Sequence, residues 1–197
     1  DTQMVLPIEK VCYQAQEVAA VIATDRYSAA DGVELVEVEY EPLPVVTDPF
    51  KATAKDAPII RDDKEGQDSN HIFHWESGDK KGTAQAFKDA DVTLKQDIYL
   101  PRIHVASIET CGCVSEFDSV TGQLTVWMTT QAPHAIRTVL ALVAGHVGLQ
   151  EDKIRVISPD IGGGFGGKVP VYPGYVIAIA ASVVTGLPIK WIEDRRE

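Results

Sequence analysis

The part of the sequence with the clearest chemical potential is a glycine-rich segment, residues 161–168, which reads I-G-G-G-F-G-G-K. It follows a predicted strand and precedes a predicted helix. Glycine has no Cβ, so backbone N–H groups in such a loop can approach an anion or an oxo ligand closely, and positive φ angles are accessible. A helix that starts behind the loop adds a partial positive charge. The segment therefore predicts a place for an anionic or oxo ligand.

Two other interpretations of this segment stay open on these residues alone. Gly162, Gly164 and Gly167 satisfy the dinucleotide-binding pattern G-x-G-x-x-G, and Glu193 lies where a ribose-binding acid could follow. A Pro-Asp pair, however, separates the preceding strand from the first glycine. The loop could also be a turn needed only for packing. A P-loop is excluded, because no Gly-Lys-Ser/Thr stands at the required spacing.

The elements that must position this loop are those of a mixed α and β chain. Apolar residues at helical spacing predict helices over residues 25–34, 83–90, 133–143 and 172–185. Continuous or alternating apolar residues predict strands over residues 18–23, 36–40, 92–99, 113–117, 123–129, 153–157 and 188–192. A hairpin turn is expected over residues 118–122. Residues 48–70 show no period and predict a linker.

The composition excludes several classes of function. The chain has 197 residues, 45% of them hydrophobic and 24% charged, which is typical of one or two globular domains. Its net charge of -11 argues against a nucleic-acid groove. No apolar run approaches the roughly 20 residues of a membrane helix, and the start lacks signal-peptide features. Three cysteines, two of them in C-x-C, do not suit a disulfide scaffold, so a cytoplasmic location is expected.

Several separated motifs, in order along the chain, resemble the large, molybdenum-binding chains of the xanthine oxidase and aldehyde oxidase family. The glycine segment is similar to that family's Gly-Phe-Gly loop, and Thr130-Gln131 to its Thr-Gln pair. Residues 77–83 (SGDKKGT) and 108–114 (IETCGCV) resemble the carbon monoxide dehydrogenase branch of the family. The opening, ending in VEVEYEPLP, is similar to the family's hammerhead domain. The chain, which lacks a starting Met, is interpreted as a fragment of such a subunit.

The resemblance implies an α+β fold with three parts. Residues 1–47 would be the C-terminal part of an α/β-hammerhead domain, and residues 48–70 a linker. Residues 71–197 would be the first part of a mixed α/β molybdenum-cofactor-binding domain that continues beyond the fragment.

The resemblance also implies which residues hold the cofactor. Gln131 would be the catalytic residue, because its side-chain amide can donate to an oxo ligand of molybdenum without carrying a charge. The loop residues that would line the cofactor are Gly163, Gly164, Phe165 and Gly166, with Phe165 shaping the pocket and backbone N–H groups facing the metal's ligands or the pterin. The implied cofactor is molybdopterin cytosine dinucleotide, carrying molybdenum alone or a molybdenum–copper pair.

The implied activity is oxidation of a carbon centre with oxygen taken from water, most directly of CO to CO2. Electrons would pass to an iron–sulfur small subunit and an FAD medium subunit, in a dimer of heterotrimers, with neither nucleic acid nor membrane as a partner. Alternatives are oxidation of an aldehyde or N-heterocycle, or a non-catalytic module that docks the other subunits. The isolated fragment is expected to be inactive, since the family's catalytic glutamate lies further along the chain.

Other reactive residues are assigned supporting roles. Cys111 and Cys113 face the same side of a strand and are expected to be small buried residues. Glu109 is interpreted as structural, because the family's basic glutamate lies far downstream. Asp160 could brace the glycine loop through backbone hydrogen bonds. His134 is the only histidine near the expected site.

Overall fold

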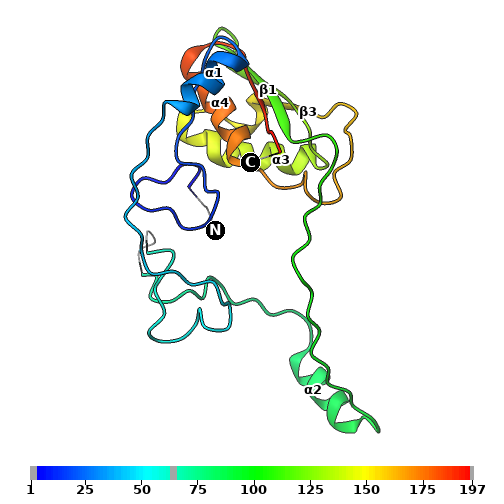
Figure 1. Cartoon of the computed structure of the whole chain (residues 1–197). Coiled ribbons are helices and arrows are strands. Elements are labelled where there is room, and N and C mark those ends of the chain that lie inside the picture. The colour runs from blue at the N-terminus through cyan, green and yellow to red at the C-terminus, as the bar shows by residue number, and fades with distance from the viewer. Residues whose placement is uncertain (1–3, 63–65, 196–197) are drawn as a thin grey trace. The chain divides into compact units, whose positions relative to one another are not determined.

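The helices and strands of the chain are seen in a computed structural model that describes residues 4–62 and 66–195 (Figure 1). They are, in order, α1 Arg26–Glu34, α2 Lys80–Asp89, β1 Gly112–Asp118, β2 Gln123–Met128, α3 Pro133–Ala144, η1 Gly145–Val147, η2 Glu151–Lys153, β3 Ile154–Ile157, α4 Pro173–Thr185 and β4 Ile189–Ile192. The chain divides into two compact units, one of residues 1–38 with 103–197 and one of residues 39–102. The first unit holds all four strands.

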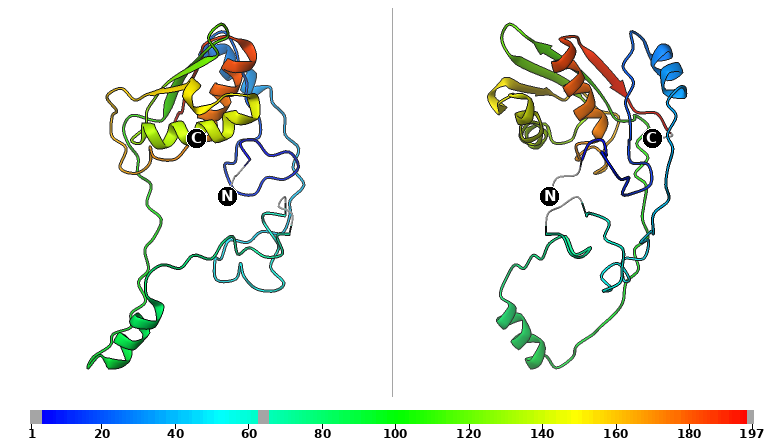
Figure 2. Two further views of the ribbon diagram at one scale, coloured as in Figure 1. Left: turned by 180° about the vertical axis from the view of Figure 1, so that it is seen from behind. Right: turned by 90° about the vertical axis from the view of Figure 1, so that its left-hand side faces the viewer.

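The four strands form one mixed sheet in the order β3-β2-β1-β4. β1 pairs antiparallel with both β2 and β4, whereas β2 pairs parallel with β3. α4 packs on β1 and β4, α3 packs on β3, and both helices lie on the same face of the sheet (Figure 2). The loop of interest connects β3 to α4, so it runs from the sheet to its helical layer. The fold class expected from the sequence, mixed α and β, is confirmed.

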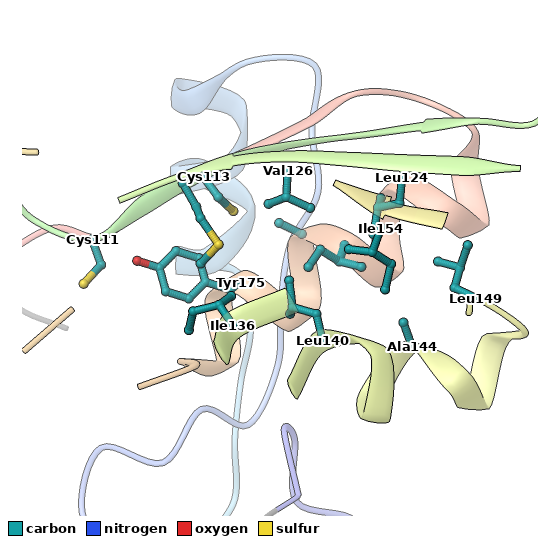
Figure 3. Packing of buried hydrophobic residues seen from close by; sticks show 13 residues of the cluster. Cys111, Cys113, Leu124, Val126, Ile136, Leu140, Ala144, Leu149, Ile154 and Tyr175 are labelled. Carbon is teal, nitrogen blue, oxygen red and sulfur yellow. The ribbon is translucent and has the colours of Figure 1, made fainter. Parts of the chain in front are cut away.

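The core lies between this face of the sheet and the two helices. Leu124 and Val126 of β2 are fully buried and alternate with outward residues, as a half-buried strand requires (Figure 3). Ile136 and Leu140 of α3 lie one turn apart and meet them from the helical layer. Tyr175 of α4 is 1% exposed, and its ring stands edge-on to Trp191 of β4. Burial of these side chains fixes both helices against the strands that flank the loop.

Local signals set the ends of several elements as the sequence predicts. Asp25 caps α1, because its side chain accepts from the backbone N–H groups of Tyr27 and Ser28 at 2.9 and 3.0 Å. The turn between β1 and β2 is closed by Asp118, whose carbonyl accepts from Gly122 N at 2.8 Å. The predicted helices α1, α3 and α4 and the predicted strands β1 to β4 are all confirmed, within a few residues at their ends.

Three predicted strands are wrong. No strand forms over residues 18–23, 36–40 or 92–99, and most side chains of these three segments are exposed. A strand needs a neighbour to receive its backbone hydrogen bonds, and no described segment pairs with them. The helix expected from residue 83 begins at Lys80 instead, because Asp79 caps it by accepting from Gly82 N at 2.9 Å.

The second unit, residues 39–102, contains α2 and otherwise irregular chain. Within this unit, the Asn70 side chain joins three positions of the segment 52–60. Asn70 Nδ2 donates to the carbonyls of Ala52 and Pro58 at 2.9 and 2.8 Å, and Asn70 Oδ1 accepts from Ile60 N at 2.8 Å. In the segment predicted as a linker, the described residues 48–62 and 66–70 therefore have internal order without a helix or strand. In the part of the chain that the structure describes, no helix is long and apolar enough to cross a membrane.

Candidate functional site

Gln131 lies in the short connection between β2 and α3, directly beside the end of the glycine loop. Its backbone N–H donates to the Lys168 carbonyl at 3.0 Å. Thr130 Oγ1 donates to the same carbonyl at 3.2 Å, and Ser158 Oγ donates to the Thr130 carbonyl at 2.7 Å. Three segments that are separate in sequence are thus joined at one point. The structure brings together the Thr-Gln pair and the glycine loop that the sequence analysis singled out.

The side-chain amide of Gln131 has a defined orientation. Its Oε1 accepts from Gly166 N at 3.0 Å and from Lys168 N at 3.2 Å. A backbone N–H can only donate, so the oxygen and not the nitrogen must face the loop. Among the described residues Nε2 has no hydrogen-bond partner, and the residue is exposed. Two N–H donors of Gln131 therefore remain for a ligand.

Gly164 is required by the side chain of Gln131. A Cβ added at Gly164 would overlap Cδ and Oε1 of Gln131. On either side, Gly163 and Phe165 have positive φ of 86° and 50°, and Gly166 follows at 92°. Such a conformation is easy for glycine and strained for phenylalanine, whose side chain here is 79% exposed. The loop is shaped to present backbone and one aromatic ring at the surface.

The N–H groups of this loop divide into two sets. The first set donates within the protein. Gly162 N donates to the Glu109 carboxylate, Gly166 N to Gln131 Oε1, and Gly167 N to the Gly164 carbonyl. In the described part of the chain, the three consecutive N–H groups of residues 163–165 have no partner. Successive free N–H groups with alternating φ form a concavity that attracts an anion. Of the predicted lining residues, Gly163, Gly164 and Phe165 have free N–H groups, whereas the N–H of Gly166 orients Gln131.

Lys168, at the end of the loop, forms an ion pair with Glu109. Lys168 Nζ lies 2.5 Å from Glu109 Oε2, and the Lys168 side chain is 2% exposed. The same oxygen accepts from Gly162 N at 2.6 Å. The hydrogen bond from Lys168, with a smaller contribution from Gly162 N, lowers the pKa of Glu109 below its ordinary value. The two residues are 59 positions apart, and no spacing in the sequence could have linked them.

Asp160 does not brace the loop as expected. Among the described residues it makes no hydrogen bond, and Glu109 provides the brace instead. His134 is exposed, and among the described residues its side chain has no hydrogen-bond partner, while its backbone carbonyl accepts from Thr138 Oγ1. Cys111 and Cys113 are buried as predicted, and burial raises the pKa of Cys113 to about 12. The described residues contain no group of three or more His, Cys, Asp or Glu that could hold a metal ion.

The structure argues against the dinucleotide interpretation, because the acid expected to bind a ribose, Glu193, has partners within the protein. The carboxylate of Glu193 accepts from Cys111 N at 2.9 Å, and Glu193 N donates to the Cys111 carbonyl at 3.0 Å. Both bonds extend the pairing of β4 with β1 and leave the acid turned toward the sheet. The strand after α4 also joins β1 and not the strand before the loop, unlike a dinucleotide-binding βαβ unit.

Two family models match the chain. The molybdopterin cofactor-binding domain matches residues 63–197, and the a/b hammerhead domain of aldehyde oxidase and xanthine dehydrogenase matches residues 1–44. The fold is thus the end of a hammerhead domain followed by a molybdenum-cofactor-binding domain.

Individual relatives agree with these matches. The carbon monoxide dehydrogenase large chain of Hydrogenophaga pseudoflava is 53% identical over the whole of this chain and 25% of its own length. The nicotine 6-hydroxylase large subunit of Paenarthrobacter nicotinovorans is 35% identical over the whole of this chain and 23% of its own. A crystal structure of the Cu,Mo-CO dehydrogenase in its carbon monoxide reduced state is 54% identical, with a TM-score of 0.84 over 98% of this chain and 25% of that one. The chain therefore spans about a quarter of the length of these relatives.

Proposed function

The chain belongs to the family of molybdopterin cofactor-binding domains, and from this premise we propose that it forms part of the catalytic subunit of a molybdenum hydroxylase. The proposed reaction oxidises a carbon centre with oxygen taken from water, and the proposed substrate is CO. Identity to a carbon monoxide dehydrogenase large chain, 53%, exceeds identity to a nicotine hydroxylase subunit, 35%, and this difference favours CO over an N-heterocycle.

The observation that carries the proposal is the set of hydrogen-bond donors at the loop. Gln131 directs its amide nitrogen away from the protein because its oxygen is held by two backbone N–H groups. The free N–H groups of residues 163–165 add three more donors from the neighbouring loop. All are uncharged, and together they suit an electron-rich, oxygen-bearing group. The residues present therefore fit the molybdenum cofactor that the family implies.

Each residue has a separate task in this proposal. Gln131 Nε2 and the free N–H groups of residues 163–165 would hold and orient the cofactor by donating hydrogen bonds to it. The exposed ring of Phe165, next to these donors in sequence, would border the bound cofactor. When bound, the cofactor supplies the two-electron oxidation chemistry; the chain supplies orientation and electrostatic complementarity.

Several finer features belong to the same proposal. The cofactor would be molybdopterin cytosine dinucleotide, and copper would accompany molybdenum as it does in the named Cu,Mo relative. Partners would be an iron–sulfur small subunit and an FAD medium subunit in a dimer of heterotrimers, located in the cytoplasm. The hammerhead part would be residues 1–47, the linker residues 48–70, and the cofactor-binding part residues 71–197.

The experiment that tests the function is metal analysis of the complete, freshly purified subunit with its partners. We expect about one molybdenum per chain if one cofactor occupies each site, accompanied by copper. If active protein contained molybdenum but no copper, the result would favour an aldehyde or an N-heterocycle as the substrate in place of CO. Absence of molybdenum from freshly assembled protein would contradict the proposal.

A further inference from the structure

The Glu109–Lys168 ion pair differs from the other ion pairs that the structure describes. The Lys80–Glu76 pair has side chains 81% and 56% exposed, whereas the Lys168 side chain is 2% exposed. Removing an ammonium group from water is costly, and a well-packed apolar side chain often serves stability better. A buried lysine next to a loop of glycines is therefore poorly explained by stability alone. Its contacts point to a different purpose.

The pair holds both ends of the glycine loop at once. At the start, Glu109 Oε2 accepts from Gly162 N at 2.6 Å. At the end, the Lys168 ammonium group donates to the same oxygen at 2.5 Å. Residues 163–165, which carry the free N–H groups, lie between these two anchored positions. Any movement of the ion pair would change the width of the loop.

Lys168 also holds Gln131. Its backbone N–H donates to Gln131 Oε1 at 3.2 Å, and its carbonyl accepts from Gln131 N at 3.0 Å. The side chain of Lys168 thus fixes its own backbone, and that backbone fixes the orientation of the Gln131 amide. We propose that the Glu109–Lys168 ion pair is a positioning device, which sets where the Gln131 amide and the free loop N–H groups stand relative to the bound cofactor. This inference rests on the proposed function.

Glu109 acts in this device by position and not as a base. One of its oxygens accepts from two donors, and the lowered pKa of its carboxyl group keeps it ionised at neutral pH. A lowered pKa makes a carboxylate a weaker base. The Lys168 side chain is 2% exposed and the bonded oxygen of Glu109 is held by Gly162 N and Lys168 Nζ, so the pair acts through Gln131 and the loop.

The test uses the complete subunit with its partners and the variant Lys168→Met, which keeps side-chain length and loses the charge. We expect molybdenum per chain to stay at the wild-type level while kcat falls about 100-fold, since displacement of a positioned group by about 1 Å has an effect of this size. KM should stay near the wild-type value. The electron paramagnetic resonance spectrum of molybdenum(V) should change, and hydrogen exchange of residues 161–168 should become faster. Lys168→Arg, which keeps the cation, should recover part of kcat.

Lys80→Met is the matched control, because it removes the lysine of an exposed ion pair whose partner is Glu76 and not a residue of the glycine loop; it should leave every readout unchanged. Wild-type kcat and spectrum in Lys168→Met would overturn the inference, while molybdenum and turnover in the wild type would leave the proposed function standing. Activity lost only in proportion to molybdenum would also overturn it. If Lys168→Met does not fold, Glu109→Gln is measured in its place and the same spectrum decides. A wild-type protein without molybdenum would overturn both proposals.

Discussion

The side-chain oxygen of Gln131 accepts hydrogen bonds from two backbone N–H groups, so its amide nitrogen can donate to a ligand. Gln131→Glu separates these two roles, because a carboxylate still accepts from Gly166 N and Lys168 N but cannot donate outward. We expect kcat to fall about 10²- to 10³-fold in the complete subunit, the usual effect of removing one preorganised donor. Gln131→Ala should lose as much, with subunit assembly intact. Steady-state kinetics and size-exclusion chromatography would measure both.

The control for this experiment is Gln123→Ala, which removes an exposed glutamine at the other end of β2. Turnover that survives in Gln131→Glu would mean that Gln131 only holds the loop. Turnover that survives in Gln131→Ala as well would favour a module whose role is to dock other subunits.

The Glu109 carboxylate also makes folding stability depend on pH. Its pKa is lower in the folded protein than the ordinary 4.5, so the folded state favours the ionised form. This contribution is complete above the unfolded pKa and is lost as pH falls through the folded pKa. Denaturant unfolding of the wild type should therefore show declining stability on the acid side of 4.5. Glu109→Gln should show a shallower decline; an identical slope in both proteins would contradict the assignment.

The contact between α4 and β4 depends on a glycine. A Cβ at Gly174 would overlap the ring of Trp191, whereas one at Gly145, at the end of α3, would meet nothing within 4 Å. Gly174→Ala should lower the free energy of unfolding by about 1–3 kcal/mol through overpacking. Gly145→Ala, with φ of -56°, should be neutral or raise it by about 0.4–1 kcal/mol. Chemical denaturation compares them, and equal effects of the two substitutions would be the contrary result.

Strands that pair with a neighbour within this chain could be predicted from sequence, and the segments without a partner strand could not. The apolar stripes of α3 and α4 and the alternation of β2 matched the structure because the sheet gives them a surface. Residues 92–99 have the same alternation but no described partner strand. At the site, motif resemblance identified Gln131 and the loop. The brace from Glu109 depends on contacts across 53 and 59 residues, which local pattern does not encode.

As a whole molecule, the chain exposes many large apolar side chains. Phe50, Leu94 and Ile108 are between 91% and 93% exposed. Apolar surface of this extent usually marks a region covered by other parts of a protein, and the chain spans about a quarter of its relatives' length. We expect the isolated 197-residue chain to show no CO-dependent dye reduction, with the complete enzyme as the positive control. Turnover by the isolated chain would contradict this.

All the hydrogen-bond donors that the described residues present at the site are amides, either of the backbone or of Gln131. Amides, unlike imidazole, ammonium or carboxyl groups, do not take part in proton equilibria in the ordinary pH range. The donors themselves therefore neither gain nor lose protons in that range. A bell-shaped dependence of turnover on pH would accordingly report groups other than these donors.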